Sequence, residues 1–111
     1  MEFKAMARFV RISPYKLRPI ADVVRGKNAN YGLGWLTTCG LRRAEAVQKV
    51  VASAVANAKQ KDQNLQASDL LIHELKVDHG PMFRYFKPGA MGRSNVYRKR
   101  LSHISVILKK I

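Results

Sequence analysis

The sequence predicts an α+β fold: a small three-stranded antiparallel sheet packed on about three helices, with a long protruding β-hairpin arm. Apolar residues alternate with polar ones near both ends of the chain, which indicates strands, and recur with a helical period between them. Residues 80–100 fit neither pattern, although they lie between two predicted strands. The 111 residues suit one domain, residues 1–111, whose arm spans residues 79–101.

The first strand is predicted close to the N-terminus, over residues 3–10. There Phe3, Ala5, Ala7 and Phe9 alternate with Lys4, Met6, Arg8 and Val10. This period of two predicts a strand with one face directed to the protein interior.

A first helix is predicted next, with Ser13 as its N-cap and Pro14 at its first helical position. Gly26 is suited to end this helix at its C-terminus. Pro19 conflicts with this helix because its ring would clash with the carbonyl group of Tyr15. We therefore expect a kink there, or a helix whose regular hydrogen bonding begins later. The apolar stripe of the helix comprises Leu17, Ile20, Ala21 and Val24.

The strongest helical pattern covers residues 41–60, with Thr38 as a possible cap. A short helix over residues 31–38 has weaker support, because Gly32 and Gly34 lower helix propensity. The stripe predicted to be buried in the long helix comprises Leu41, Ala44, Val47, Val51, Ala54, Val55 and Ala58.

Two further strands are predicted at residues 70–77 and 101–111. Leu75 and Val77 lie on one face of the former. Ile104, Val106 and Leu108 share a face of the latter. The segment between these strands is far longer than an ordinary hairpin loop of about two to five residues. About ten residues out and ten back, at about 3.3 Å per residue, would reach about 30 Å from the body.

The charge balance indicates a partner with negative charge. Lys and Arg total 21 against 7 Asp and Glu, a net charge of +14, which favours nucleic acid first and an anionic membrane surface second. No run approaches the roughly 18 apolar residues of a spanning helix, and residues 1–10 lack the continuous apolar region of a secretion signal. The single cysteine, Cys39, permits no internal disulfide, which fits a reducing cytoplasm. Together these features lead us to expect a soluble cytoplasmic protein.

The spacing of the candidate residues disfavours catalysis and metal binding. His73 and His79 would share a strand face but lie about 20 Å apart by strand rise. His103 has neighbouring serines, yet no acid follows Asp78 to orient a Ser–His pair. Cys39 is distant in sequence from any obvious base. We expect no enzyme activity, no metal and no cofactor.

Two acid-free segments favour a nucleic-acid partner. Residues 3–21 hold five Lys or Arg, and residues 79–111 hold eight. Each such side chain can neutralise a phosphate, and the arginine fork can hold one bidentately. The aromatic residues of the arm can stack on unpaired RNA bases; they are Phe83, Tyr85, Phe86 and Tyr97. Lys59, Lys61 and Lys109 are better explained as solubilising surface residues.

Three segments, in this order and spacing, resemble the bacterial large-subunit ribosomal protein twenty-two family: RISPYKLRPIADVVRGK, SAVANA and GPMFRYFKPGAMGRSNVYRKRLSHISV. The resemblance covers essentially the whole chain. It implies a constituent of the large subunit of cytoplasmic ribosomes that binds 23S rRNA and assists subunit assembly, with an arm that lines the nascent-peptide exit tunnel. The implied partners are this rRNA, neighbouring large-subunit proteins and the nascent peptide, with no membrane and no homo-oligomer.

The resemblance also implies site residues. Those that bind rRNA would be Arg8, Arg11, Ser13, Lys16, Arg18, Arg25, Lys27, Arg84, Lys87, Arg93, Arg98, Lys99, Arg100, Ser102 and His103. The arm tip that faces the tunnel would be Pro88, Gly89, Ala90, Met91, Gly92 and Arg93.

The chain departs from the family pattern at three positions. Gly89 stands where a basic residue is usual, Met91 where glutamine is common, and Pro19 where the family has an ordinary helix residue. The first two remove expected polar contacts at the tip. Two rival classes share the charge pattern: a stand-alone RNA chaperone or regulatory RNA binder, and a protein that binds anionic membrane surfaces.

Overall fold

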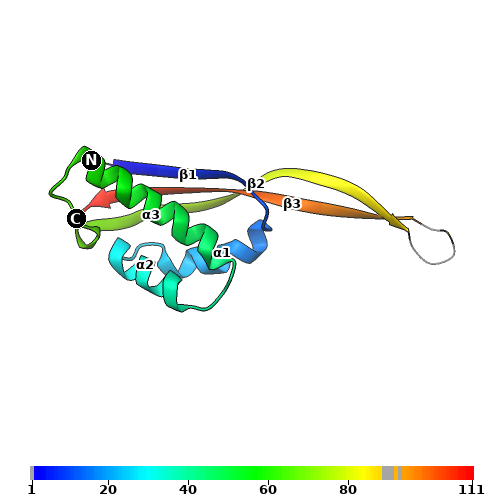
Figure 1. Ribbon diagram of the computed structural model, residues 1–111, viewed down its shortest axis with the longest axis horizontal. Helices are drawn as coiled ribbons and strands as arrows, with labels where there is room; N and C mark the ends of the chain where they lie inside the picture. The colour runs from blue at the N-terminus through cyan, green and yellow to red at the C-terminus, as the bar shows by residue number, and fades with distance from the viewer. Residues whose placement is uncertain (1, 89–91, 93) are drawn as a thin grey trace.

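The computed structural model describes residues 2–88, 92 and 94–111 (Figure 1). Its elements are β1 (Glu2–Val10), α1 (Pro14–Val24), α2 (Ala29–Thr38), α3 (Ala44–Lys61), the 3₁₀ turn η1 (Ala67–Asp69), β2 (Leu70–Pro88) and β3 (Ser94–Lys110). The strands form one antiparallel sheet in the order β1-β3-β2, with β3 in the centre. The predicted α+β class is confirmed.

Strands β2 and β3 extend well beyond the helices as a two-stranded ribbon (Figure 1). Although residues 80–100 show no alternation in the sequence, the backbone pairs as far as Pro88 opposite Ser94. The molecule measures 64 × 24 × 17 Å, and its radius of gyration is 17.0 Å. A compact chain of this length would have a radius of gyration of about 13 Å. The arm is thus an extension of two sheet strands, and it gives the molecule its length.

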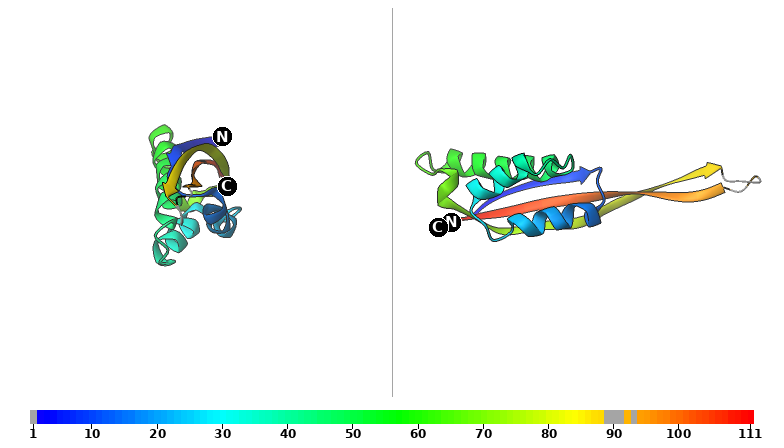
Figure 2. Two further views of the ribbon diagram at one scale, coloured as in Figure 1. Left: turned by 90° about the vertical axis from the view of Figure 1, so that its right-hand side faces the viewer. Right: turned by 90° about the horizontal axis from the view of Figure 1, so that it is seen from below.

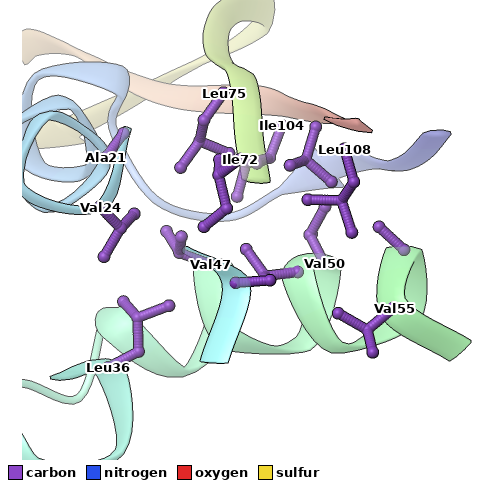
Figure 3. Packing of buried hydrophobic residues seen from close by; sticks show 14 of the residues in the cluster. Ala21, Val24, Leu36, Val47, Val50, Val55, Ile72, Leu75, Ile104 and Leu108 are labelled. Atoms are coloured by element: carbon purple, nitrogen blue, oxygen red, sulfur yellow. The ribbon is translucent and has the colours of Figure 1, made fainter. Parts of the chain in front are cut away.

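The core lies between one face of the sheet and the helices (Figure 3). Helix α1 packs against β2, α3 packs against β1, and α2 packs against α3. The predicted stripe of α1 is buried in full, and β3 contributes its predicted inward face; these residues are Leu17, Ile20, Ala21, Val24, Ile104, Val106 and Leu108. Helix α1 runs from Pro14 to Val24 as one element with Pro19 inside it. A kink at Pro19 stays a prediction.

The start of the long helix differs from the prediction. Helix α3 begins at Ala44, and Leu41 is 41% exposed instead of buried. Gly40 has a φ of 74°, which breaks the chain direction between α2 and α3. Thr38 does not cap α3, because its hydroxyl group donates back to the Gly34 carbonyl within α2 at 3.0 Å. The remaining members of the predicted stripe are buried, from Ala44 to Ala58.

The predicted short helix is present as α2, and one of its glycines has a packing role. The Asn28 side chain caps the helix by accepting from the Asn30 N–H at 2.8 Å. At Gly32 an added Cβ would lie 2.8 Å from Cδ1 of Ile72 in the sheet. Gly32 therefore lets the helix approach the sheet closely, which outweighs its low helix propensity.

Phe9 is the exception to the alternation of β1. The register shifts between Ala7 and Val10, and Phe9 has a φ of 59°, which is uncommon for a residue with a side chain. Its side chain is 59% exposed and packs edge-on against His103, with 5.1 Å between ring centroids. The alternation placed Phe9 with the inward residues, and this was wrong because a bulge ends the regular strand at Ala7.

Both outer edges of the sheet have hydrogen-bond partners in the body. The link between α1 and α2 pairs with β2: the Gly26 N–H donates to the Ile72 carbonyl, and the Ile72 N–H donates to the Lys27 carbonyl, each at 2.9 Å. On the other edge the Asn57 amide of α3 donates to the Lys4 carbonyl at 3.0 Å. Such contacts lower the number of unpaired backbone groups at which another chain could pair.

Candidate nucleic-acid interface

The arm leaves the body at a bulge. His79 pairs with Ser102 and Met82 pairs with Arg100, so Gly80 and Pro81 together oppose one residue of β3. A Cβ at Gly80 would lie 3.1 Å from the backbone carbonyl atoms of that residue, Leu101. Such a bulge bends a strand and increases its twist, and Figure 2 shows the two strands twisting about each other along the arm. The base of the arm therefore depends on a residue without a side chain at position 80.

The backbone register of the arm brings cationic positions opposite one another. Arg84 is the direct partner of Arg98 in the ladder, and Tyr85 is the partner of Tyr97. Like charges at directly opposite positions destabilise an antiparallel pair. No acid follows Asp78 in the chain. The opposed cationic positions therefore favour the binding of an external anion along the arm.

The predicted arm residues fall into three groups. Lys99 and Arg100 are exposed near the arm base, and Gly92 is exposed with a φ of 76°. The backbones of the next group lie in the paired strands; they are Arg84, Lys87, Pro88 and Arg98. The last group lies outside the described residues; it is Gly89, Ala90, Met91 and Arg93.

A second basic surface surrounds the end of β1 and the start of α1. Arg8, Arg11 and Lys16 are exposed there, and Ser13 is the half-buried N-cap of α1. The Ser13 side chain makes no capping hydrogen bond within the described residues. Lys27 is exposed in the link after α1. As RNA contacts these residues stay predictions, and the structure places them where a polyanion can reach them.

Arg18 and Arg25 have structural partners on β2. The Arg25 guanidinium donates to the Leu75 carbonyl through Nε at 3.1 Å and through Nη2 at 2.7 Å, and it also pairs with Asp22. Arg18 donates to the Val77 carbonyl at a longer distance, 3.4 Å. Both arginines cover carbonyl groups on the outer edge of β2, which is a stabilising role that the sequence did not indicate.

Ser102 and His103 also have internal partners. The Ser102 side chain is fully buried and its hydroxyl group donates to the Ile12 carbonyl, which ties β3 to the segment after β1. This burial does not favour Ser102 as an RNA contact, and its role there stays a prediction. Nδ1 of His103 accepts a hydrogen bond from the Phe9 N–H at 3.1 Å. His103 is half-buried.

Tyr15 is a candidate site residue that the sequence pattern did not single out. It is 58% exposed on the first turn of α1, and the Arg18 and Arg100 guanidinium carbons each lie 5.5 Å from its ring centroid. His79 lies edge-on to the same ring at 5.7 Å. The spacing of Tyr15 and Arg18, three apart on a helix, was the available signal.

The described parts of the chain offer little for other chemistry. Across residues 2–88, 92 and 94–111, no three His, Cys, Asp or Glu side chains gather as metal ligands would. In the same residues, every helix falls short of the length and apolar character needed to cross a membrane. The fold and its surface thus define a class: a small basic protein with a cationic arm that suits a large polyanion.

Comparison with known proteins narrows this class. The model of the family Ribosomal protein L22p/L17e matches residues 5–109. Large ribosomal subunit protein uL22 of Pelotomaculum thermopropionicum is 44% identical over 108 residues, which cover 97% of this chain and 95% of the relative. The uL22 protein of Desulfitobacterium hafniense is 45% identical over 105 residues, 95% of this chain and 91% of the relative. The chain belongs to the L22p/L17e family of ribosomal proteins, which are not enzymes.

Proposed function

We propose that this chain is a structural constituent of the large subunit of cytoplasmic ribosomes, where it binds 23S rRNA and assists assembly. The observation that carries the proposal is the family match over residues 5–109, which includes both the body and the arm. Relatives similar over nearly their whole length are named as large ribosomal subunit proteins. The basic surfaces at the arm and at the start of α1 supply the contacts to phosphate groups.

The arm is proposed to line the wall of the nascent-peptide exit tunnel. In the described residues the arm is a ribbon of two strands that extends beyond the helices, so it reaches far from the body at a width of only two chains. It can enter packed RNA where a globular domain would not fit. The tip at residues 88–93 would then face the nascent peptide.

Ordering of the arm is proposed to accompany RNA binding. A lone two-stranded ribbon is marginal in water, so RNA packed around the strands would supply much of its stability. If six phosphates are engaged, the logarithm of the binding constant falls with the logarithm of salt concentration at a slope of about −4 to −5.

The open face of the sheet is proposed to meet neighbouring ribosomal proteins. Two lysines of this face are paired with acids, since Lys76 lies 3.6 Å from Glu74 and Lys109 lies 3.6 Å from Glu2. Met6, which is 58% exposed, lies on the same face, and Lys4 lies beside it. Ion-paired lysines next to an exposed apolar side chain suit a protein surface better than a phosphate backbone. The proposed contacts of this face involve other ribosomal proteins and no second copy of this chain.

Sedimentation of a cell extract tests the proposed function against its rivals. The protein should co-migrate with the large subunit through moderate salt in a sucrose gradient. A free fraction would favour the RNA chaperone, and a vesicle-bound fraction would favour the membrane-surface protein. Either result would remove the ribosomal assignment.

Photo-crosslinkers placed at single positions test the finer assignments on intact particles. A crosslinker at Lys99 should capture rRNA, one at Met6 should capture protein, and one at Met91 should capture a stalled nascent peptide. Capture of RNA alone from Met6 would contradict the assignment of the open face. An absence of nascent-peptide adducts at Met91 would contradict the tunnel contact.

A further inference from the structure

Tyr15 lies where three elements meet at the base of the arm. It belongs to the first turn of α1, while His79 belongs to β2 and Arg100 to β3. The Arg18 and Arg100 guanidinium carbons lie 5.5 Å from its ring centroid, and the His79 ring lies at 5.7 Å with an interplanar angle of 72°. One exposed ring thus contacts side chains separated by more than 80 residues of sequence.

The local structure explains why these side chains meet. Residues three apart lie on one side of a helix, which places Arg18 beside Tyr15. The bulge next to His79 shifts the register and makes Arg100 the partner of Met82, just beyond the end of the body. Gly80 permits this geometry because its backbone passes close to Leu101.

The charges of this cluster have no internal counterpart. Every Asp and Glu lies within the described residues, and none is within ion-pair distance of Arg18 or Arg100. The electron-rich face of an aromatic ring attracts a cation but carries no net charge that would neutralise it. A bound anion would neutralise these charges, and each planar guanidinium can hold a phosphate group bidentately.

We propose that Arg18 and Arg100 form a binding site for the phosphate backbone of RNA at the base of the arm, with Tyr15 as its positioning residue. This inference rests on the proposed rRNA-binding function. The ring of Tyr15 holds the guanidinium groups of Arg18 on α1 and Arg100 on β3 in fixed positions. The RNA backbone can then bind the body and the arm at the same time. Tyr15 acts through the two arginines, and its ring is not a stacking surface for a base.

The test uses the full-length protein and a transcript of the large-subunit rRNA, with affinity measured over a series of salt concentrations. Tyr15→Leu should weaken binding roughly fivefold to thirtyfold, the size expected from two exposed cation–π contacts. It should also make the salt slope shallower by about one, because one phosphate contact is lost. Tyr15→Phe keeps the ring and should bind within about twofold of the unmodified protein.

Tyr31 provides a matched control. It is a tyrosine on α2 with 55% exposure, close to the 58% of Tyr15, and no cation–π contact of its ring occurs in the described part of the chain. Tyr31→Leu should change neither the affinity nor the slope. Circular dichroism at each salt concentration checks that the variants are folded, and Tyr15→Gln replaces Tyr15→Leu if the latter unfolds.

A double-mutant cycle separates positioning from stacking. If Tyr15 acts through Arg100, Tyr15→Leu has a smaller effect when Arg100→Gln is already present. If the ring stacks on a base, its effect persists in that background and leaves the salt slope unchanged, which overturns the proposal. Equal binding by Tyr15→Leu and the unmodified protein overturns it as well. If the unmodified protein shows no preference for this rRNA, the proposed function itself fails.

Discussion

The body and the arm are built from the same two strands, yet they differ in what stabilises them. Along the body, β2 and β3 bury one face against helices; Leu70, Ile72, Leu75, Val77, Ile104, Val106 and Leu108 are at most 5% exposed. In the arm, by contrast, the described side chains are exposed; they are Pro81, Met82, Lys99 and Arg100. The comparison teaches that backbone pairing carries the arm away from the body, whereas burial of side chains stabilises the body.

The largest expected effect separates core from arm. Leu75→Ala should lower the free energy of unfolding by about 2–5 kcal/mol, because it leaves a cavity under β2. Replacing residues 83–99 with Asn-Gly, which favours a tight hairpin turn, should change it by less than about 1 kcal/mol. Urea denaturation of both variants measures the difference. A truncated protein as unstable as Leu75→Ala would show that the arm contributes to the core.

The second expected effect concerns RNA binding by the arm base. Changing Arg98, Lys99 and Arg100 together to glutamine should weaken binding to the rRNA transcript and make the salt slope shallower by about two to three. The matched control changes Lys59, Lys61 and Lys110, three exposed cations on α3 and at the end of β3. An unchanged slope for the arm variant, or an equal loss in the control, would contradict the arm as an anchor.

A third comparison uses two glycines. Gly80→Ala should destabilise the protein by about 1 kcal/mol, because the new Cβ would press against the Leu101 backbone at 3.1 Å. Gly34→Ala should stabilise it by about 0.5–1 kcal/mol, since position 34 is exposed in α2 and no atom lies within 4 Å of the added Cβ. Thermal unfolding of both variants measures the signs, and a stabilising Gly80→Ala would refute the close approach at the arm base.

The smallest expected effect concerns Phe9, at the end of the strand that has no part in the arm. Phe9→Gly should be more stable than Phe9→Ala by about 1 kcal/mol, because glycine adopts a φ of 59° without steric cost. Both variants lose the contact with His103, so their difference isolates the backbone. Equal unfolding free energies would mean that the bulge relaxes when the ring is removed.

Burial explains which parts of the fold could be predicted from the sequence. The stripe from Leu17 to Val24 and the alternation of residues 104–108 were readable because each has one face in the core. The paired strands of residues 82–88 and 94–100 were not, because strand alternation arises only where one face is buried. Phe9 and Leu41 were misplaced where a bulge and a left-handed glycine interrupt the regular patterns.

The candidate RNA-binding site could be predicted only in part, for a similar reason. An acid-free run of cations indicates a polyanion partner wherever it occurs, so Lys99 and Arg100 could be chosen without knowledge of the fold. The internal partners of Arg25 and Ser102 depend on strand edges and on a loop distant in sequence, which no local pattern records. Tyr15 was missed because its contact with Arg100 exists only once α1 meets β3.

The continuity of β3 from Ser94 to Lys110 has a consequence for how far the arm can reach. One extra residue in each strand would turn every side chain beyond it to the opposite face, and a second would restore the original faces. An arm of this kind can therefore lengthen or shorten without exchanging its faces only in steps of two residues per strand, about 7 Å each. The reach of the arm is therefore set in units of two residues per strand.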